Sequence, residues 1–448
     1  MPFTRRRFLT TSALAAPFIL PSGLRAQGPS KKLAHAAIGI NGQAASDIAA
    51  LMESGRLEVV AIADVDKRNH ASAKERFPKA TIYQDWRELF EKEAGRIDSV
   101  NVTVPDHMHG VVAMTALNLK KHVYCQKPLT HTVGEARALQ MAAQKAGVVT
   151  QMGNQIHSSS EYRSAAKLVQ DGAIGKVKEV HCWSGARFPQ EIRPGGADAV
   201  PEGLNWDHWL GVAPERPYKD SIYHPFNWRG WQDFGGGAIG DFGCHIMDTP
   251  FKALGLTAPL SVECTGAEEA WIKTPSRFQE SWPAWEVFRY EFPGTPLTAG
   301  PTMPLYWSDG GQLPTGEALE VFKGSQIPPN GALFIGTEGS LMIVHYGARP
   351  YLFPEEKNKQ FRKTPPVPGN PQEHYTSFVL SCLGEGKTTD HFDYAAPLAE
   401  AALLGTIAVR QPNKKLLWEA PALSFKDNAA ATALVQPKIR DGWKVAGI

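Results

Sequence analysis

Short apolar runs alternate with longer amphipathic segments along the first third of the chain. The runs are rich in β-branched residues, and the segments between them have the apolar spacing of helices. Strands and helices that alternate in this way predict a parallel, doubly wound α/β sheet with helices on both faces. The strands are expected at 33–38, 57–63, 97–104, 122–125 and 148–152, and the helices at 45–54, 110–119 and 133–146.

The second half of the chain has a different pattern, in which apolar and polar residues alternate one by one. Residues 284–292 show it best, and such alternation is typical of a strand with one buried face. The region 294–326 is rich in glycine and proline and is predicted to form loops, whereas 393–410 is rich in Ala and Leu and predicts a helix that packs back on the first domain. Further strands are expected at 177–186, 261–264, 332–335 and 340–345.

The N-terminus has the features of an export signal. A twin arginine lies in Thr4-Arg5-Arg6-Arg7-Phe8-Leu9, an apolar run follows over 13–20, and Leu24-Arg25-Ala26 resembles a cleavage site. This order predicts a twin-arginine (Tat) signal peptide and a periplasmic protein. The apolar run is far shorter than the roughly 20 residues of a membrane span, so we expect no span in the mature form.

Length and composition fit two domains of a globular protein. The chain has 448 residues, of which 43% are hydrophobic and 21% charged, and its net charge is +2. A nucleic-acid-binding protein would have a strong basic excess, so nucleic acid is not an expected partner. The predicted divisions are a signal peptide (1–27), a nucleotide-binding domain (28–155), a substrate and oligomerisation domain (156–425) and a C-terminal tail (426–448).

The first predicted turn has the composition of a dinucleotide site. It matches the G-x-G-x-x-G pattern in part, with Gly39 at the first glycine, Asn41 at the second and Ala44 at the third. Such a turn lets the backbone approach a pyrophosphate, to which the next helix offers its N-terminal N–H groups. Asp64 follows the second strand, where an acid binds the ribose hydroxyls. A carboxylate there repels a 2′-phosphate, which favours NAD over NADP.

Short polar motifs follow the predicted strand ends of the first domain, and one more motif lies in the second domain. Ligands bind at the carboxyl ends of parallel strands, so these motifs hold the candidate site residues. The motif of the second domain places an acid and a histidine four residues apart, on one face of a helix. The motifs are Pro105-Asp106-His107-Met108-His109, Gln126-Lys127-Pro128, Gly153-Asn154-Gln155 and Gly240-Asp241-Phe242-Gly243-Cys244-His245.

A Lys-Pro pair at a strand end, combined with a distant D-x-x-x-H, resembles the Gfo/Idh/MocA oxidoreductase superfamily over essentially the whole mature chain. The stretches 205–211 and 227–231 look like its Tat-exported group, which is similar to glucose–fructose oxidoreductase. The resemblance implies a Rossmann domain that binds NAD. It also implies a second domain with a large open mixed sheet that holds a sugar substrate against the nicotinamide, and a homo-oligomer, dimer or tetramer.

Oxidation of a secondary alcohol removes a hydride and a proton, so it needs a base and a cation near the hydroxyl. By resemblance, Lys127, Asp241 and His245 match the catalytic residues of the superfamily, with His245 as the natural base. Without the resemblance, the acid and the histidine would be a helix-surface pair in which the acid caps the helix. Gln126 replaces the acid of the usual Glu-Lys-Pro and leaves Lys127 without one possible charge partner.

The remaining candidates concern the cofactor and the substrate. The H-x-H of His107 and His109 has no evident third ligand, so we expect no metal and infer that it positions the cofactor or a helix. The cofactor-binding candidates are Gly39, Asn41, Gly42, Gln43, Ala44, Asp64, Pro105, Asp106, His107, His109, Gln126, Lys127 and Asn154. The substrate-pocket candidates, each equally explicable as structural, are Asn154, His157, Tyr162, Arg187, Tyr223, His224, Trp228 and Arg229.

Three functions remain open from the sequence. The first is oxidation of a sugar or cyclitol by tightly bound NAD. It would be redox-neutral overall, because the Tat pathway carries folded proteins into a periplasm without free nicotinamide nucleotide. The second is glycoside cleavage through transient oxidation at C3, elimination, addition of water and reduction. The third is a sugar-binding protein that keeps the cofactor only structurally, against which the acid–base residues count.

Overall fold

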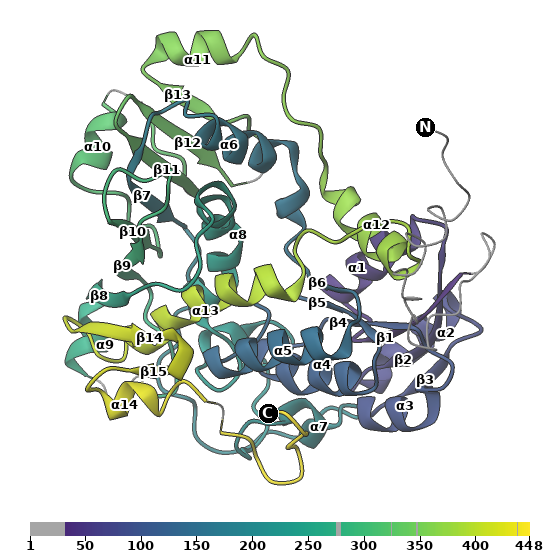
Figure 1. Cartoon of the computed structure of the whole chain (residues 1–448). Coiled ribbons are helices and arrows are strands. Elements are labelled where there is room, and N and C mark those ends of the chain that lie inside the picture. The colour runs from purple at the N-terminus through teal and green to yellow at the C-terminus, as the bar shows by residue number, and fades with distance from the viewer. Residues whose placement is uncertain (1–31, 275–278, 324, 346–347, 437) are drawn as a thin grey trace, which may run out of the picture. The chain divides into compact units, whose positions relative to one another are not determined.

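The computed structural model describes residues 32–274, 279–323, 325–345, 348–436 and 438–448. Two β-sheets with associated helices make up this part of the chain (Figure 1). The predicted signal peptide, 1–27, lies outside the described residues. Within them, no helix combines the length and the apolar character that crossing a membrane requires.

The first sheet has six parallel strands in the order β3-β2-β1-β4-β5-β6, which is the strand order of dinucleotide-binding folds. Helices cover both of its faces, which is why strands such as β4 are buried at every position. The strands are β1 (Leu33–Ile38), β2 (Leu57–Ala63), β3 (Thr81–Tyr83), β4 (Ser99–Val102), β5 (His122–Cys125) and β6 (Thr150–Met152). The helices are α1 (Gln43–Met52), α2 (His70–Arg76), α3 (Trp86–Glu93), α4 (His109–Asn118) and α5 (Val133–Ala146).

The sequence predicted most of this sheet. The bounds of β1, β2, β5 and α5 are confirmed, whereas α1 begins earlier than expected and β4 is shorter than the strand predicted at 97–104. The sequence did not predict α2, β3 and α3, which lie between β2 and β4 along the chain.

The second sheet has nine strands in the order β13-β12-β11-β7-β10-β9-β8-β14-β15. It is mixed, because β7 and β10 run parallel while their other neighbours run antiparallel. The predicted fold class, a Rossmann domain followed by a domain with a large mixed sheet, is therefore confirmed. The strands are β7 (Val177–Trp183), β8 (Ser261–Ala267), β9 (Glu286–Pro293), β10 (Thr302–Ser308), β11 (Gly331–Gly336), β12 (Ser340–Val344), β13 (Tyr351–Phe353), β14 (Lys415–Glu419) and β15 (Ser424–Phe425).

The prediction that 294–326 forms only loops is wrong. This region contains β10, which lies between β7 and β9 near the middle of the sheet, and the short helix α10 (Glu317–Val321). Met303, Leu305 and Trp307 are fully buried and alternate with less buried residues, as in any strand with one covered face. The glycine and proline residues of the flanking turns made this alternation difficult to recognise in the sequence.

Three long helices pack against the second sheet: α6 (Ser160–Gln170), α8 (Gly237–Leu254) and α13 (Phe392–Ala408). The expectation that α13 also packs on the first domain is confirmed, because it contacts α5 and its Glu400 pairs with Arg137 at 2.7 Å. The chain returns to the first sheet once more through α12 (Pro371–Cys382), which packs against α1. The short helices are α7 (Trp206–Leu210), α9 (Glu269–Lys273), α11 (Glu355–Phe361) and α14 (Ala429–Thr432).

Candidate active site

The glycine-rich turn between β1 and α1 requires a glycine at its first position. Gly39 has a φ of +90°, and a Cβ there would lie 2.2 Å from the carbonyl oxygen of Thr103 at the end of β4. Any side chain would therefore clash with the backbone. Gly42, the last residue before α1, also has a positive φ, of 57°. The turn lies at the carboxyl edge of the sheet, where a dinucleotide binds in this fold.

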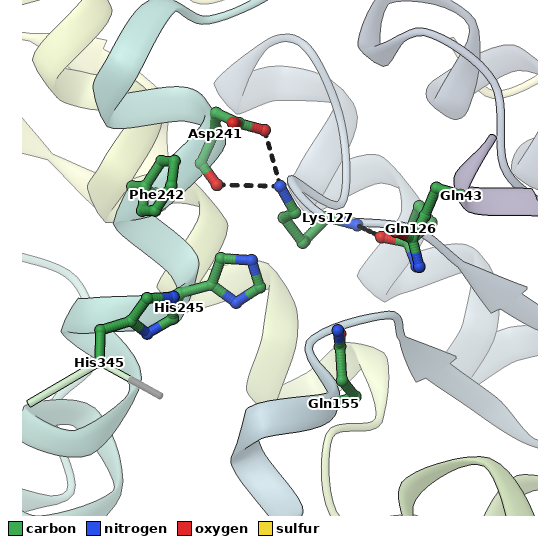
Figure 2. Close-up of a pocket in the computed structure, with 8 residues that line it drawn as sticks. All are labelled: Gln43, Gln126, Lys127, Gln155, Asp241, Phe242, His245 and His345. Carbon is green, nitrogen blue, oxygen red and sulfur yellow. Dashed lines mark hydrogen bonds and ion pairs between the residues drawn. The ribbon is translucent and has the colours of Figure 1, made fainter. Parts of the chain in front are cut away.

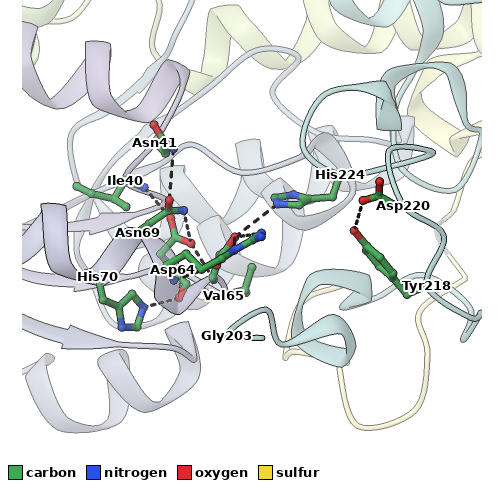
Figure 3. Close-up of polar contacts among 12 residues, drawn as sticks. Ile40, Asn41, Asp64, Val65, Asn69, His70, Gly203, Tyr218, Asp220 and His224 are labelled. Carbon is green, nitrogen blue, oxygen red and sulfur yellow. Dashed lines mark hydrogen bonds and ion pairs between the residues drawn. The ribbon is translucent and has the colours of Figure 1, made fainter. Parts of the chain in front are cut away.

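Asp64 lies directly after β2 and is held against this turn (Figure 3). Its carboxylate accepts the backbone N–H of Ile40 at 3.2 Å and that of Asp66 at 2.9 Å. The side-chain amide of Asn69 donates to it at 3.3 Å and is itself linked to Asn41. Burial raises the pKa of Asp64, because none of these partners carries a positive charge. The carboxylate is thus fixed where the sequence predicts a ligand for ribose hydroxyls.

A second acid lies two residues further along. Asp66 pairs with Arg68, with 2.5 Å between Oδ2 and Nη2, and this hydrogen-bonded pairing lowers the pKa of Asp66. His224 lies 3.8 Å from the same carboxylate, which places it at this end of the site. Two carboxylates beside the end of β2, with the nearby arginine already engaged, form a site that suits a ribose diol and disfavours a 2′-phosphate. The residues therefore fit NAD.

A segment of the second half of the chain pairs with the loop that follows β2. The N–H of Lys67 donates to the carbonyl of Gly203 at 3.0 Å, and the N–H of Asn205 donates to that of Val65 at 2.9 Å. The side-chain amide of Gln84 reaches the carbonyls of both Val65 and Gly203, each at 2.9 Å. We call these contacts the clasp. They tie the loop beside Asp64 to a segment outside the first sheet, and Figure 3 labels one residue of each, Val65 and Gly203.

The reaction end of the site joins the two sheets through an ion pair. Lys127 follows β5 of the first sheet, and its Nζ lies 2.7 Å from Oδ1 of Asp241 on α8 (Figure 2). The same Nζ donates to the backbone carbonyl of Asp241 at 3.0 Å. Arg229 adds a second cation, with its Nε 3.3 Å from Oδ1. The structure therefore brings together two of the three predicted catalytic residues.

Two acids in this region have pKa values that are shifted in opposite directions. Burial alone would raise the pKa of Asp241, but the cations of Lys127 and Arg229 outweigh it, so the pKa lies below its ordinary value. Asp106, which follows β4, faces the same charges without a direct ion pair, and burial raises its pKa to about 7. Asp241 is thus an anion at neutral pH, whereas burial favours the protonated form of Asp106 far more than in an ordinary aspartate.

The start of α8 sets the position of Asp241 and His245. The helix begins at Gly237, whose φ is +66°, and a Cβ there would meet the Trp282 ring at 2.9 Å. Only glycine fits this tight entry, and the helix that the sequence predicts for Asp241 and His245 is confirmed. His245 follows Asp241 by one turn, so both side chains line the same cavity (Figure 2).

His245 is oriented by Asn154, which follows β6. The Nδ1 of His245 lies 2.6 Å from Oδ1 of Asn154, and Nδ2 of Asn154 donates to the backbone carbonyl of Cys244 at 3.0 Å. Burial lowers the pKa of His245 well below its ordinary value, and the positive charge of Lys127 lowers it further. The imidazole is therefore neutral at physiological pH, as a general base must be.

The cavity between these residues has a volume of about 180 Å³. Five residues of its lining were predicted from the sequence, and three were not. The predicted ones are Gln43, Gln126, Lys127, Asp241 and His245, and the others are Gln155, Phe242 and His345.

His345 is the most informative of the missed residues, because it adds a second imidazole to the cavity. It follows β12, and its ring centroid is 5.1 Å from that of His245 (Figure 2). Its Nδ1 lies 3.2 Å from the hydroxyl of Tyr162. Its position as the last residue of a predicted strand was the only signal in the sequence.

Asp47 of α1 is a second missed residue, and it compensates for the glutamine at 126. The side-chain amide of Gln126 donates to Asp47 at 2.9 Å, and three further donors reach this carboxylate from Gln43, Thr103 and Tyr375. A carboxyl group thus lies one side chain away from position 126, on α1. Lys127 itself has Asp241 as its partner.

The two histidines of the H-x-H motif contact backbone carbonyls. His107 lies 3.1 Å from the carbonyl of Trp209, and His109 lies 2.8 Å from those of Pro128 and Val104. Burial lowers the pKa of His107 to about 3 and that of His109 to about 4. Within the described part of the chain, no cluster of three possible metal ligands is found.

Most of the predicted substrate residues lie outside the cavity lining. Tyr223 and Trp228 are buried in an aromatic cluster, and Arg187 is exposed. His157 is buried against Asp248 of α8, with both carboxylate oxygens 2.9 Å from its Nδ1. Tyr223, Trp228 and His157 are thus core residues in this structure. Arg229 reaches the site through Asp241, and Tyr162 reaches it through the backbone carbonyl of His245 and the ring of His345.

Comparison with known proteins identifies both halves of the chain. Residues 33–154 match the family model of Gfo/Idh/MocA oxidoreductases described as an NAD-binding Rossmann fold. Residues 163–278 match the model of the C-terminal alpha/beta domain of the oxidoreductase family. Together the two models cover more than half of the chain.

Individual relatives are distant. Levoglucosan dehydrogenase of Pseudarthrobacter phenanthrenivorans is 24% identical over 188 residues, 42% of this chain and 40% of the relative. Inositol 2-dehydrogenase of Salmonella typhimurium is 29% identical over 34% of this chain and 47% of its own length. The matches thus span less than half of these curated relatives. The crystal structure of GenD2 from gentamicin A biosynthesis, in complex with NAD, has a TM-score of 0.58 at 19% identity over 89% of this chain and 99% of that one, which shows the shared fold.

Proposed function

Because the chain belongs to the NAD-binding Gfo/Idh/MocA oxidoreductase family, we propose that it oxidises a secondary alcohol of a sugar or sugar derivative. One observation carries this proposal. Lys127, which follows β5, and Asp241 of helix α8 meet at 2.7 Å in a cavity that His245 also lines. Alcohol oxidation needs a base and a cation around one hydroxyl. NAD, when bound, supplies the acceptor for the hydride.

Each of the three residues has a distinct task. His245 takes the hydroxyl proton on its Nε2, because Nδ1 faces Asn154. Lys127 directs its positive charge at the oxygen on which negative charge develops. Asp241 holds the lysine ammonium in place through two contacts, one from its carboxylate and one from its backbone carbonyl. Arg229 supports the same carboxylate from the other side.

The substrate class follows from the relatives. Levoglucosan is an anhydrosugar and inositol is a cyclitol, and both present secondary alcohols on a six-membered ring. A cavity of about 180 Å³ suits the reacting part of such a ring. We therefore favour a sugar, sugar acid, cyclitol or glycoside as the substrate.

The cofactor is proposed to stay on the protein between turnovers, and the overall reaction to be redox-neutral. The clasp supports retention, because the loop beside Asp64 is tied to residues 203–205 by backbone hydrogen bonds. The twin-arginine sequence at residues 5–7 supports export of a folded, loaded protein. An exported enzyme without access to free nucleotide has to reoxidise its own NADH with a second substrate or with its own intermediate.

The proposal is tested on purified protein without added nucleotide. Denaturation should release about one NAD per chain, and addition of levoglucosan, myo-inositol or a methyl glucoside should raise the absorbance of bound NADH at about 340 nm. Repeated product formation with no added nucleotide is expected for the closed cycle. Protein that binds no NAD at all would overturn the proposal. One stoichiometric reduction without further turnover would reject the closed cycle and leave a plain dehydrogenase.

A second candidate function is glycoside cleavage by transient oxidation, and His345 is the observation that favours it. A simple alcohol oxidation needs one base, whereas elimination next to a ketone needs a second group to take the proton from the adjacent carbon. His245 and His345 line one cavity with ring centroids 5.1 Å apart. Cleavage in D₂O would place deuterium on the carbon next to the oxidised one, and product without deuterium would reject this candidate.

Export and assembly are further parts of the proposal. We expect residues 1–27 to be removed in the periplasm and the mature chain to form a dimer or tetramer. N-terminal sequencing of protein from the periplasmic fraction, with the twin arginine intact or changed to lysines, tests the first. Light scattering of the mature chain tests the second.

A further inference from the structure

The hydrogen bonds around Asn154 determine which nitrogen of His245 carries its proton. The carbonyl oxygen of Cys244 can only accept a hydrogen bond, so the atom of Asn154 that lies 3.0 Å from it must be the amide nitrogen. The amide oxygen then faces Nδ1 of His245 at 2.6 Å. An oxygen in this position can only accept, so Nδ1 must carry the hydrogen. The neutral imidazole therefore keeps its lone pair on Nε2.

Asn154 is well placed to enforce this state. It is fully buried and follows β6 of the first sheet, whereas His245 is on α8 beside the second sheet. Its two polar atoms contact consecutive residues of α8, Cys244 and His245, so the side chain cannot rotate without losing both hydrogen bonds. Both are buried, and losing a buried hydrogen bond is costly.

The orienting group is an amide and carries no charge. A carboxylate in the same place would stabilise the imidazolium and raise the pKa of His245. The other groups that face this histidine do not replace such a charge. Lys127 is a cation and lowers its pKa, His345 lowers it as well, and Tyr162 donates a hydrogen bond to the backbone carbonyl of His245. Asp241, one turn earlier on α8, is already paired with Lys127.

We propose that Asn154 is a positioning residue that fixes His245 as the Nδ1–H tautomer and, because it is uncharged, keeps proton transfer at His245 reversible. This inference rests on the proposed function and deepens it. In the forward step the hydroxyl proton goes to Nε2, and the carbon-bound hydrogen leaves with its electron pair to the nicotinamide. In the return step the proton goes back to the carbonyl oxygen and the hydride to the carbonyl carbon. A base that holds its proton weakly serves both directions, which a redox-neutral cycle requires.

The tautomer is measured without any substrate. In protein labelled with ¹⁵N-histidine, the His245 signal is assigned by its loss in His245→Gln. We expect a protonated Nδ1 and an unprotonated Nε2. In Asn154→Asp, an isosteric change that adds a charge, the titration midpoint of His245 should rise by about one to three pH units. Asn154→Ala should abolish the fixed tautomer. Asn118→Asp, at an exposed asparagine of α4, is the matched control and should leave the signal unchanged.

The kinetic readout uses the cofactor that the protein carries. With a sugar that reduces it, Asn154→Asp should leave a larger share of the cofactor reduced at equilibrium, roughly tenfold more per pH unit of midpoint shift. The pH profile of the return step should move with the His245 midpoint. A general loss of structure would lower the rates in both directions without moving the profile.

The outcomes separate this inference from the proposed function. A proton on Nε2 of wild-type His245, or a midpoint that Asn154→Asp does not raise, overturns the role of Asn154 even if sugars reduce the cofactor. If the tautomer is as expected but no sugar reduces the bound cofactor, the proposed function fails. The reversibility assigned to Asn154 then fails with it, because there is no hydride transfer to reverse.

Discussion

Two partly buried aspartates lie at the two ends of the site, and their pKa values are shifted in opposite directions. Asp64, beside the glycine-rich turn, accepts hydrogen bonds from two backbone N–H groups and one amide, and burial raises its pKa. Asp241, on α8, is equally enclosed, but Lys127 and Arg229 outweigh burial and lower its pKa. The carboxylate of Asp64 is thus held by hydrogen bonds from neutral groups, whereas the carboxylate of Asp241 forms an ion pair.

The difference shows what each end can do. A carboxylate bound only by neutral donors keeps lone pairs for hydroxyl groups, which suits recognition of a ribose. A carboxylate that fixes a cation organises charge around a reacting oxygen, which suits catalysis. If this division is correct, changes at the reaction end affect turnover and leave the nucleotide bound, while changes at the nucleotide end affect retention and cofactor choice.

The largest expected effect is at the reaction end. His245→Ala removes the base, and loss of a general base typically costs about 10²- to 10⁴-fold in rate. NAD bound per chain, measured after denaturation, should equal that of the wild type, because His245 lies in the cavity with Lys127 and Asp241 and not near Asp64. Near-normal turnover would show that the base lies elsewhere, with His345 as the first residue to examine.

A smaller effect is expected from the ion pair itself. Asp241→Asn keeps the shape but leaves two cations without their anion, so we expect turnover to fall roughly ten- to a hundredfold, in the lower part of the range for charged catalytic groups. Asp64→Asn is the matched control at the other end and should change turnover at saturating NAD far less. Equal losses in the two variants would contradict the division of tasks.

The same pair of variants predicts opposite pH dependences of stability. The pKa of Asp241 is lowered on folding, so its contribution to stability is present above its ordinary pKa, about 3.9, and is lost as pH falls. The pKa of Asp64 is raised, so its contribution is present below that value and is lost as pH rises. Thermal unfolding of nucleotide-free protein between about pH 4 and 8 should show Asp241→Asn losing most stability near neutrality. Asp64→Asn should lose the least stability near neutrality.

Cofactor choice is the next smaller effect. Asp64→Ala removes the proposed acceptor of the ribose hydroxyls, and a charged hydrogen bond is worth about 1.5–3 kcal/mol, so NAD should bind roughly ten- to a hundredfold more weakly. Discrimination against NADP should relax, because the repulsion of the 2′-phosphate is gone. Calorimetric titration of both nucleotides into nucleotide-free protein measures this. Wild-type protein that prefers NADP would contradict the role of Asp64.

The sequence predicted the first sheet better than the second, and the reason is physical. Strands such as β1 and β5 are short apolar runs between helices, and burial on both faces makes them conspicuous. Strand β10 has one covered face and lies between glycine- and proline-rich turns, so composition concealed it. Its position in the middle of the sheet depends on pairing with β7, which is distant in the sequence, on the side opposite to the preceding strand β9.

The sequence predicted only those site residues that belong to short motifs. Lys127, Asp241 and His245 stand in recognisable patterns, and the structure places them around one cavity. Asp47 and His345 stand in no motif, because their positions depend on how α1 and β12 pack against other elements. Tyr223, a substrate candidate, illustrates the converse difficulty. Aromatic composition does not distinguish a residue in the core from one in a pocket, and Tyr223 is fully buried.

The smallest predicted effect tests the nucleotide end alone. Gln84 holds the clasp by donating to the carbonyls of Val65 and Gly203, each at 2.9 Å, while the backbone hydrogen bonds of the clasp do not depend on its side chain. Gln84→Ala should therefore loosen the loop beside Asp64 without opening it, and bound NAD should leave a few-fold faster, as expected for the loss of about 1 kcal/mol. The rate is measured by trapping released NAD with an excess of a second dehydrogenase. Gln144→Ala, at an exposed glutamine of α5, is the control of the same residue type. Faster NAD loss with unchanged reduction of the bound cofactor by a sugar would support separate ends, whereas an equal fall in the reduction rate would mean that the clasp also positions the reaction end.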